Sequence, residues 1–271
     1  MTEQTSTAPT ASTPDHIVLL IPCPWKTMSS DALDEIFAEH WQELAHFTLS
    51  EEVTDDDFLL QGSVTFDTAS EIVEPLIYVE PPLEGIENSL TMSIDPLTHA
   101  EALLLQQHQS IWRIVIPAGQ KLGRRAIKRA SQLMATFIEA GAIAVFAPGI
   151  MRLHSPRFVR KETMDLYNPQ GMANLFVGAW HDDQWMRTRG LTAFELPEVE
   201  ISVQGGMNSA YFNLMDMAAN MLMQMRAFPS GSEIQMGHKI MKLTSVSDEH
   251  QHTDQEVPSN GYYGVQRLIS P

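Results

Sequence analysis

The stretch from Ser110 to Gly149 constrains the fold more than any other part of this sequence. Two short apolar runs, residues 111–116 and 142–146, flank a helical pattern from about Gln120 to Ala140, and Gly141 stands where helices often place a C-cap glycine. Continuous apolar runs of this length are typical of strands covered on both faces. We therefore predict two buried strands with one helix crossing between them.

The elements before this helix predict an α+β fold. Their order is β-α-β-β-α-β, which is the order of a ferredoxin-like fold. The predicted strands are residues 17–21, 58–66, 72–79 and 111–116, and the predicted helices are residues 29–45 and 98–107. We expect α+β architecture with mixed, mostly antiparallel sheets and helices packed on one face, the first part being ferredoxin-like βαββαβ.

The second half of the chain predicts further strands and helices. They are a helix at 158–166, a loop at 168–171, a hairpin of 175–180 with 184–188, a strand at 198–203, a helix at 208–226, and strands at 234–243 and 262–269. Residues 1–15 are expected to be a disordered tail, because they offer few apolar side chains. Residues 16–271 are expected to form a single compact α+β domain, with two subdomains of about 16–117 and 118–271 as the alternative.

The composition argues against several classes of protein. Of 271 residues, 17 are basic and 34 are acidic, which gives a formal net charge of −17. General binding to nucleic acid or to an anionic membrane needs clustered positive charge. No apolar run approaches the roughly 20 residues of a membrane helix, and the first 25 residues carry no Lys or Arg, so no secretory signal is expected. The single cysteine, Cys23, excludes an intramolecular disulfide. We expect a cytoplasmic protein without a cofactor.

The basic residues are unevenly distributed. Between Arg113 and Lys161 there are ten basic residues and one acidic residue, Glu139, whereas the rest of the chain has seven basic and 33 acidic residues. The central segment is therefore a positive island in a negative chain.

The predicted helix of this island has a basic face. Lys121, Arg124 and Lys128 fall opposite its apolar stripe, and Arg125 flanks the stripe. Together with the free N–H groups of a helix start, these four side chains form a candidate anion-binding or partner-binding site. The alternative is that the face meets water or neutralises the chain's own acidic loops. No glycine-rich phosphate motif supports the first interpretation.

Arg152, His154 and Arg157 follow the second apolar run. Groups just after a buried strand often bind ligands in α/β proteins, so we add these three residues to the anion or partner candidates. We assign no catalytic residue. His154 has neither a nucleophile nor a carboxylate near it in the sequence, and a single cysteine such as Cys23 is more typical of packing.

Two polar segments carry groups that can ligate metals. They are His181-Asp182-Asp183 and residues 248–254, which include His250 and His252. Acidic loops produce such clusters by chance, and no matching pair stands at helical spacing nearby. We predict no metal site, with metal binding by His250 and His252 as the alternative.

The predicted helix at residues 208–226 is rich in methionine. Asn213, Asp216, Asn220 and Gln224 make one narrow polar stripe, which leaves most of the helix surface apolar. Core packing is the favoured explanation, and an adaptable partner interface is the alternative.

Five segments of the chain form a recognisable series. They are PLIYVEPPLEG, THAEALLLQQHQ, SIWRIVIP, ATFIEAGAIAVFAPG and TRGLTAFELPEVEI. Together they resemble the bacterial domain-of-unknown-function family 4261 over roughly residues 72–226. The resemblance implies a shared fold and provides no activity or catalytic residue to transfer. The helix start KLGRRAIKR is more basic than the resemblance implies.

These observations favour a non-enzymatic, cytoplasmic protein-binding module, such as an immunity-type or accessory protein, that binds a protein partner or self-associates. The alternative is a small-anion or phosphate-binding protein, including a hydrolase or transferase, that uses the basic segment 113–161. We expect no binding to nucleic acid or membranes.

Overall fold

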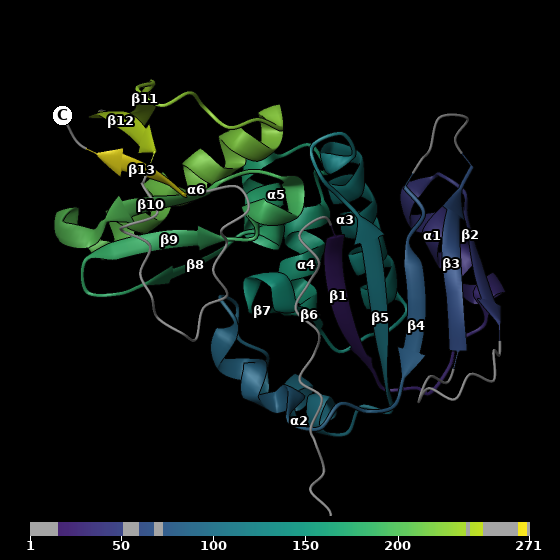
Figure 1. Ribbon diagram of the computed structural model, residues 1–271. Coiled ribbons are helices and arrows are strands. Elements are labelled where there is room, and N and C mark those ends of the chain that lie inside the picture. Colours follow the sequence, from purple (N-terminus) through teal and green to yellow (C-terminus); the bar gives the residue numbers. More distant parts are fainter. Residues whose placement is uncertain (1–15, 51–59, 68–72, 237–238, 246–264, 270–271) are drawn as a thin grey trace, which may run out of the picture.

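The chain folds into two β-sheets with helices between them (Figure 1). The structure, a computed structural model, describes residues 16–50, 60–67, 73–236, 239–245 and 265–269. The α+β class is confirmed. The predicted tail at residues 1–15 and the metal-binding alternative at His250 and His252 lie outside the described residues.

The first sheet, sheet A, has seven strands in the order β2-β3-β4-β5-β1-β6-β7. The strands are β1 (His16–Cys23), β2 (Ala45–Ser50), β3 (Leu60–Phe66), β4 (Leu76–Glu80), β5 (Ser110–Pro117), β6 (Val145–Ala147) and β7 (Arg152–His154). All neighbouring strands are antiparallel.

The ferredoxin-like order predicted for the first part is wrong. In that fold the two βαβ halves would place parallel strands in this half of the chain. Here β2, β3, β4 and β5 form an antiparallel meander that ends beside β1. The cause is β2, a strand that the sequence analysis did not predict and of which it placed only Ala45 in an element, the helix at residues 29–45. This extra strand lets the chain turn back by hairpins instead of crossing over.

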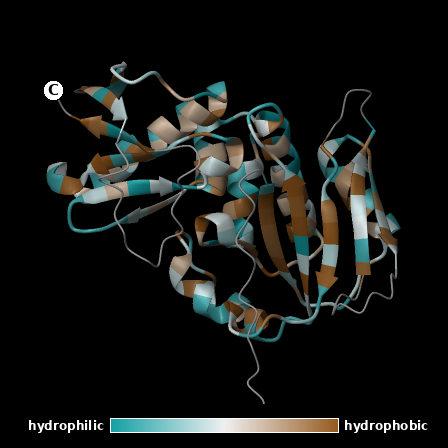
Figure 2. Cartoon of the chain, viewed as in Figure 1, coloured by the Kyte–Doolittle hydropathy of each residue, from teal (hydrophilic) through white to brown (hydrophobic). Residues whose placement is uncertain are grey.

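The predicted strand–helix–strand unit is confirmed. β5 and β6 pair with the two sides of β1 and are both antiparallel to it, so they are parallel to each other. Helix α3 (Gly123–Glu139) crosses between them and is buried along most of its length. Figure 2 shows that β1 and the end of β5, at the centre of sheet A, are largely hydrophobic.

The second sheet, sheet B, has six strands in the order β11-β12-β13-β10-β9-β8. The strands are β8 (Gly178–His181), β9 (Trp185–Arg189), β10 (Glu198–Ser202), β11 (Glu233–Met236), β12 (Lys239–Ser245) and β13 (Val265–Ile269). Only β10 and β13 are parallel among the described neighbours. The prediction of mixed, mostly antiparallel sheets is therefore confirmed, as is the β8–β9 hairpin.

The remaining helices fill the space around and between the sheets. They are α1 (Ser30–Trp41), α2 (His99–Gln106), α4 (Pro156–Thr163), α5 (Pro169–Phe176) and α6 (Met207–Gln224), with 3-10 turns η1 (Ile86–Met92), η2 (Pro148–Ile150), η3 (Leu191–Phe194) and η4 (Val203–Gly205). The predicted loop at residues 168–171 is instead the start of α5, where the side chain of Asn168 accepts a hydrogen bond from Gln170 N. No described helix has the length and apolar character needed to cross a membrane.

The helices of sheet A lie on both of its faces, which corrects the prediction of one covered face. Leu19 and Ile21 of β1 pack in the main core with α1 and α3. Leu20, on the opposite face, packs with Ile111 and with Leu105 of α2. The main core continues through α5 and α6 into sheet B. Whether the chain is one domain or two subdomains stays a prediction.

Candidate partner-binding surface

The start of α3 is anchored by backbone contacts to the η3 turn. Gly119 adopts φ 84° and donates from its backbone N to Ala193 O. The backbone N of Gln120 donates to the Glu195 carboxylate over 3.3 Å. No side chain caps the helix at Leu122. These hydrogen bonds from residues 119–120 to Ala193 and Glu195 therefore fix the position of the residues that begin α3.

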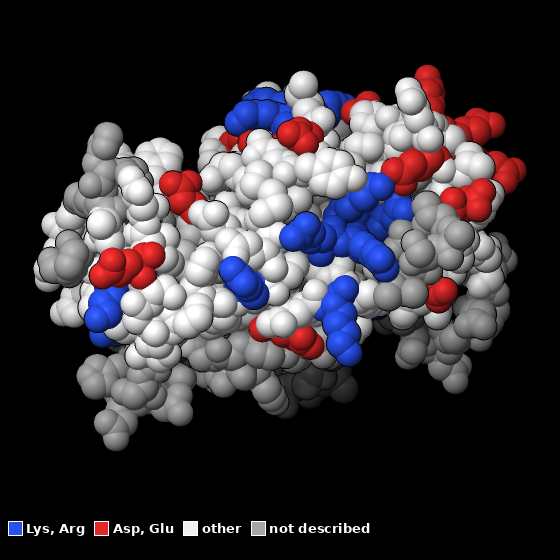
Figure 3. Space-filling model, turned by 90° about the horizontal axis from the view of Figure 1, so that it is seen from above, with Lys and Arg blue, Asp and Glu red and all other residues white. Residues whose placement is uncertain are grey.

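Lys121 and Arg124 are exposed at this helix start. Neither side chain makes an ion pair within the part of the chain that the structure describes. Figure 3 looks onto the side of the molecule where β5 ends and α3 begins, and it shows Lys and Arg side chains gathered there. Arg125, the next residue, is also exposed. The structure thus brings together three of the predicted candidates.

Arg226 joins this surface from the end of α6. A Cβ atom at Gly123 would lie 2.3 Å from the sulfur of Met225, so the end of α6 packs directly on the start of α3. Arg226, the next residue, is exposed, and its Nε donates to the Gln224 side chain over 2.9 Å. Sequence reasoning missed Arg226 because no local pattern connects residues about a hundred positions apart.

Lys128 and Arg129, one turn further along α3, are held by an acid of this chain. Lys128 Nζ lies 2.6 Å and Arg129 Nη1 lies 2.7 Å from the two oxygens of Glu43. Partial burial raises the pKa of Glu43, but the hydrogen bonds from Lys128 and Arg129 outweigh it and hold this pKa below its ordinary value. For Lys128, the structure favours the alternative that this face neutralises an acid of its own chain.

Arg152 and His154 lie inside the protein on β7. Burial lowers the pKa of the Arg152 guanidinium, and the hydroxyl of Tyr211 beside it partly offsets the effect. Its Nη1 is buried without a hydrogen-bond partner. His154 stacks on Phe158 and bonds to Leu175 O through Nε2. Burial, followed by the charge of Arg152, lowers the pKa of His154 to about 3.

Arg157 is separated from the start of α3 by the length of that helix. Glu139, the last residue of α3, pairs with Arg160 of α4, so α4 lies at the far end of a helix about 25 Å long. Arg157 itself pairs with Asp95 over 2.7 Å, where Ser155 also donates to the same carboxylate. The seven predicted residues therefore occupy separate places and do not line one pocket.

The remaining candidates from the sequence are Cys23, the metal-ligating side chains and the methionines of α6. Cys23 is fully buried, and burial raises the pKa of its thiol well above the ordinary value. Among the described residues, no group of three or more His, Cys, Asp or Glu side chains is placed to hold a metal ion. Met215, Met217 and Met221 of α6 are core residues with at most 1% exposure, so the structure favours core packing for most of this helix.

A second group of charged residues, on sheet B, is paired throughout. Glu200 of β10 is fully buried, and it binds Arg187 of β9 on one side and Arg267 of β13 on the other. The guanidinium of Arg267 lies 4.0 Å from the centre of the Trp185 ring. Sequence patterning could not identify this group, because its members come from three strands far apart in the chain.

Comparisons with known proteins identify no relative of this chain. No model of a known protein family matches the chain, and neither curated proteins nor solved structures gave a match. The resemblance to family 4261 stays a prediction.

Proposed function

We propose that the protein is a non-enzymatic, cytoplasmic protein-binding module of the immunity or accessory type, which binds an acidic partner through the surface around the start of α3. We call this the α3 surface and define it by Lys121, Arg124, Arg125 and Arg226. The observation that carries the proposal is that Lys121 and Arg124 are exposed side by side, with no acidic partner among the described residues, in a chain of net charge −17.

The position of these cations supports a role outside the folded chain. Positive side chains near a helix N-terminus oppose the helix dipole and cost typically a few tenths of a kcal/mol each. Elsewhere in the positive island, Arg113 pairs with Glu80, Lys128 with Glu43 and Arg160 with Glu139. Acidic groups of a partner would complement Lys121 and Arg124, which make no ion pair with any described residue, and would raise the rate of association.

The surroundings of the reactive side chains support a binding role over a catalytic one. His154 is neutral near pH 7 and fully buried, and Cys23 is buried with a raised pKa. A general base or nucleophile has to reach a substrate proton or carbon. Neither of these two side chains meets that requirement.

A charge-reversal experiment tests the proposal. The full-length protein and a Lys121→Glu/Arg124→Glu variant are purified under native conditions from the source organism, and co-purifying proteins are quantified by mass spectrometry. The matched control is Arg160→Glu/Lys161→Glu, which changes the net charge by the same amount on α4.

We expect a stoichiometric partner with an acidic surface, retained by the control, lost by the α3 variant, and released as salt rises. A partner that the α3 variant retains as well as the wild type would refute the assignment of the surface. The absence of any stoichiometric partner would refute the binding-module proposal itself.

Small-anion binding is a second candidate function, favoured by the orphaned Nη1 of Arg152. Among the described residues Arg152 makes no ion pair with an acid; an uncompensated buried cation is costly, and a bound anion would reduce that cost. The test is the shift in melting temperature produced by phosphate, sulfate or acetate at constant ionic strength, compared with Arg152→Met. We expect stabilisation of the wild type alone, and equal shifts in both proteins would refute this candidate.

A further inference from the structure

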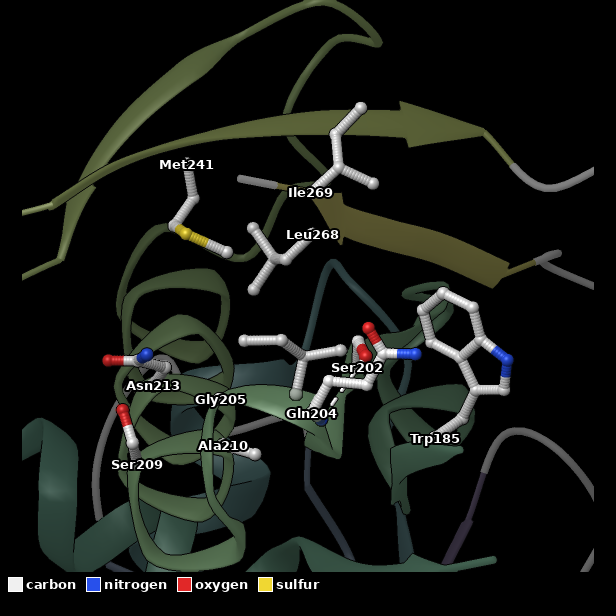
Figure 4. A pocket seen from close by; sticks show the side chains of 11 residues that line it. Trp185, Ser202, Gln204, Gly205, Ser209, Ala210, Asn213, Met241, Leu268 and Ile269 are labelled. Atoms are coloured by element: carbon white, nitrogen blue, oxygen red, sulfur yellow. Dashed lines mark hydrogen bonds between the residues drawn. The ribbon is translucent and has the colours of Figure 1, made fainter. Parts of the chain in front are cut away.

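A cavity of about 350 Å³ lies between the first turns of α6 and sheet B. Figure 4 shows Met241 and Leu268, from β12 and β13, on the sheet side of this cavity, with Ala210 of α6 facing them. Ile201 of β10 completes this apolar part of the lining. All four side chains are at most 5% exposed. The interior of the cavity is therefore hydrophobic.

Uncharged polar side chains surround this apolar interior. Ser209 and Asn213 of α6 lie on one side in Figure 4, and Gln204 of η4 lies on the other. None of these three side chains makes a hydrogen bond within the described ranges. They offer a hydroxyl and two amides, which can both donate and accept hydrogen bonds.

None of the lining residues that the structure describes is charged, although 19% of the chain is Asp, Glu, Lys or Arg. On sheet B, Arg187 and Arg267 are both engaged by Glu200, and none of the three is a lining residue of the cavity. A charged ligand entering this cavity would lose its hydration without gaining a counter-ion, which is costly. The lining therefore selects against ions of either sign.

Part of the cavity is rigid and part can adapt. The Trp185 ring at one end is held by the Arg267 guanidinium 4.0 Å from its centre, and Arg267 is itself fixed by Glu200. Met241 in the wall has a flexible thioether, which can adjust to the shape of a ligand. A largely preformed, mostly apolar cavity with a few polar groups is the usual form of a small-molecule site.

From these features we infer that the cavity binds a small, uncharged molecule with an apolar body and one hydrogen-bonding head group. The apolar body contacts Ile201, Met241 and Leu268, and the head group meets Ser209, Asn213 or Gln204. The volume is at the lower end of the roughly 300–1,000 Å³ found for ligand pockets, which suits a small molecule and not a helix of a partner. This inference does not rest on the partner-binding proposal, because the α3 surface shares no residue with the cavity.

The test uses Nile red, an uncharged apolar dye that fluoresces more strongly when it leaves water. Binding to the full-length protein is titrated by fluorescence, together with a Ser209→Phe variant, which fills the cavity from its exposed rim. The matched control is Asn220→Phe, which adds the same ring at an exposed position three turns along α6. Melting temperatures of all three proteins establish that they are folded.

We expect saturable binding by the wild type and the control, and a loss of about tenfold or more in affinity for Ser209→Phe. If Ser209→Phe does not fold, Asn213→Phe takes its place. No saturable binding by the wild type, or equal binding by the cavity variant and the wild type, would overturn the inference.

The charge of the ligand is tested by displacement of the dye. 1-Decanol, decanoate and decyltrimethylammonium share one apolar chain and differ in the head group. We expect the alcohol to displace Nile red most effectively. Displacement by either ion at equal or lower concentration would overturn the assignment of an uncharged ligand.

Discussion

Sheet B and the start of α3 differ in whether their charged side chains are paired within the chain. On sheet B, Glu200 is fully buried and binds both Arg187 and Arg267. At the start of α3, Lys121 and Arg124 are exposed, and neither makes an ion pair with another described residue. A buried charge without a partner is strongly destabilising, whereas exposed ion pairs contribute little. Paired charges inside therefore reflect the needs of folding, and unpaired charges outside are available for binding.

The same contrast occurs within α3 itself. Arg124 is exposed, while Lys128, one turn later on the same face, is held by Glu43. Arg129 beside it has only 3% of its side chain exposed and shares that carboxylate. The division between structural and available charge thus falls within four residues of one helix.

The largest effect on stability is expected from protonation of His154, because its buried site disfavours a positive charge. The folded-state pKa of His154 is about 3, below its ordinary value of 6.5, so the unfolded chain takes up this proton first. Stability is fully present above pH 6.5 and is lost as the pH falls toward 3. The loss reaches roughly 5 kcal/mol, at about 1.4 kcal/mol per pKa unit.

Urea unfolding of the wild type and of His154→Gln, at several pH values between 7 and 4, measures this contribution. The variant keeps a donor for Leu175 O and does not titrate. We expect a shallower acid-induced loss for the variant, and parallel curves would show that His154 becomes protonated within the fold.

The next effect tests the paired group on sheet B. Glu200→Gln removes the charge that Arg187 and Arg267 share, and leaves two cations facing each other. We expect a loss of about 3 kcal/mol in the free energy of unfolding, measured by urea denaturation. Glu35→Gln, at an exposed position of α1, is the control and should change stability by less than about 0.5 kcal/mol. Equal effects would contradict the structural role of Glu200.

A smaller effect is expected at the boundary within α3. Glu43→Gln weakens the hydrogen bonds to Lys128 and to the buried Arg129. Hydrogen bonds to charged groups contribute about 1.5–3 kcal/mol, and the partial exposure of Glu43 places our expectation near the lower value. Chemical denaturation measures this loss of unfolding free energy. An unchanged denaturation midpoint would mean that Glu43 does not stabilise the fold through Lys128 and Arg129.

The smallest effect on stability is expected at the α3 surface. Lys121→Glu/Arg124→Glu should change the free energy of unfolding by no more than about 0.5 kcal/mol, because surface substitutions away from structural features have small effects. It can even stabilise α3, since acids near a helix start favour the helix dipole. A loss above about 1.5 kcal/mol would show that these cations serve the fold, and would remove the contrast with sheet B.

The sequence alone determined the elements whose signals are local. The two apolar runs and the periodicity of α3 predicted the β5–α3–β6 unit, because a buried strand and an amphipathic helix each have their own spacing of apolar residues. The helix predicted at residues 29–45 starts at the right place, since the side chain of Ser29 accepts a hydrogen bond from Ala32 N at the start of α1. The uneven distribution of basic residues also pointed to the α3 surface.

Only the tertiary structure decided which charges are paired and which elements are neighbours. Glu43 meets Lys128 across 85 positions, and Arg267 meets Glu200 across 67. The placing of Arg226 beside α3 and of Ala210 opposite Leu268 is equally non-local. Such contacts depend on strand order and helix packing, which the meander of β2 to β5 set differently from the predicted order. Local periodicity predicts which face of a helix or strand is apolar. Only the packing of the elements determines which residues that face contacts.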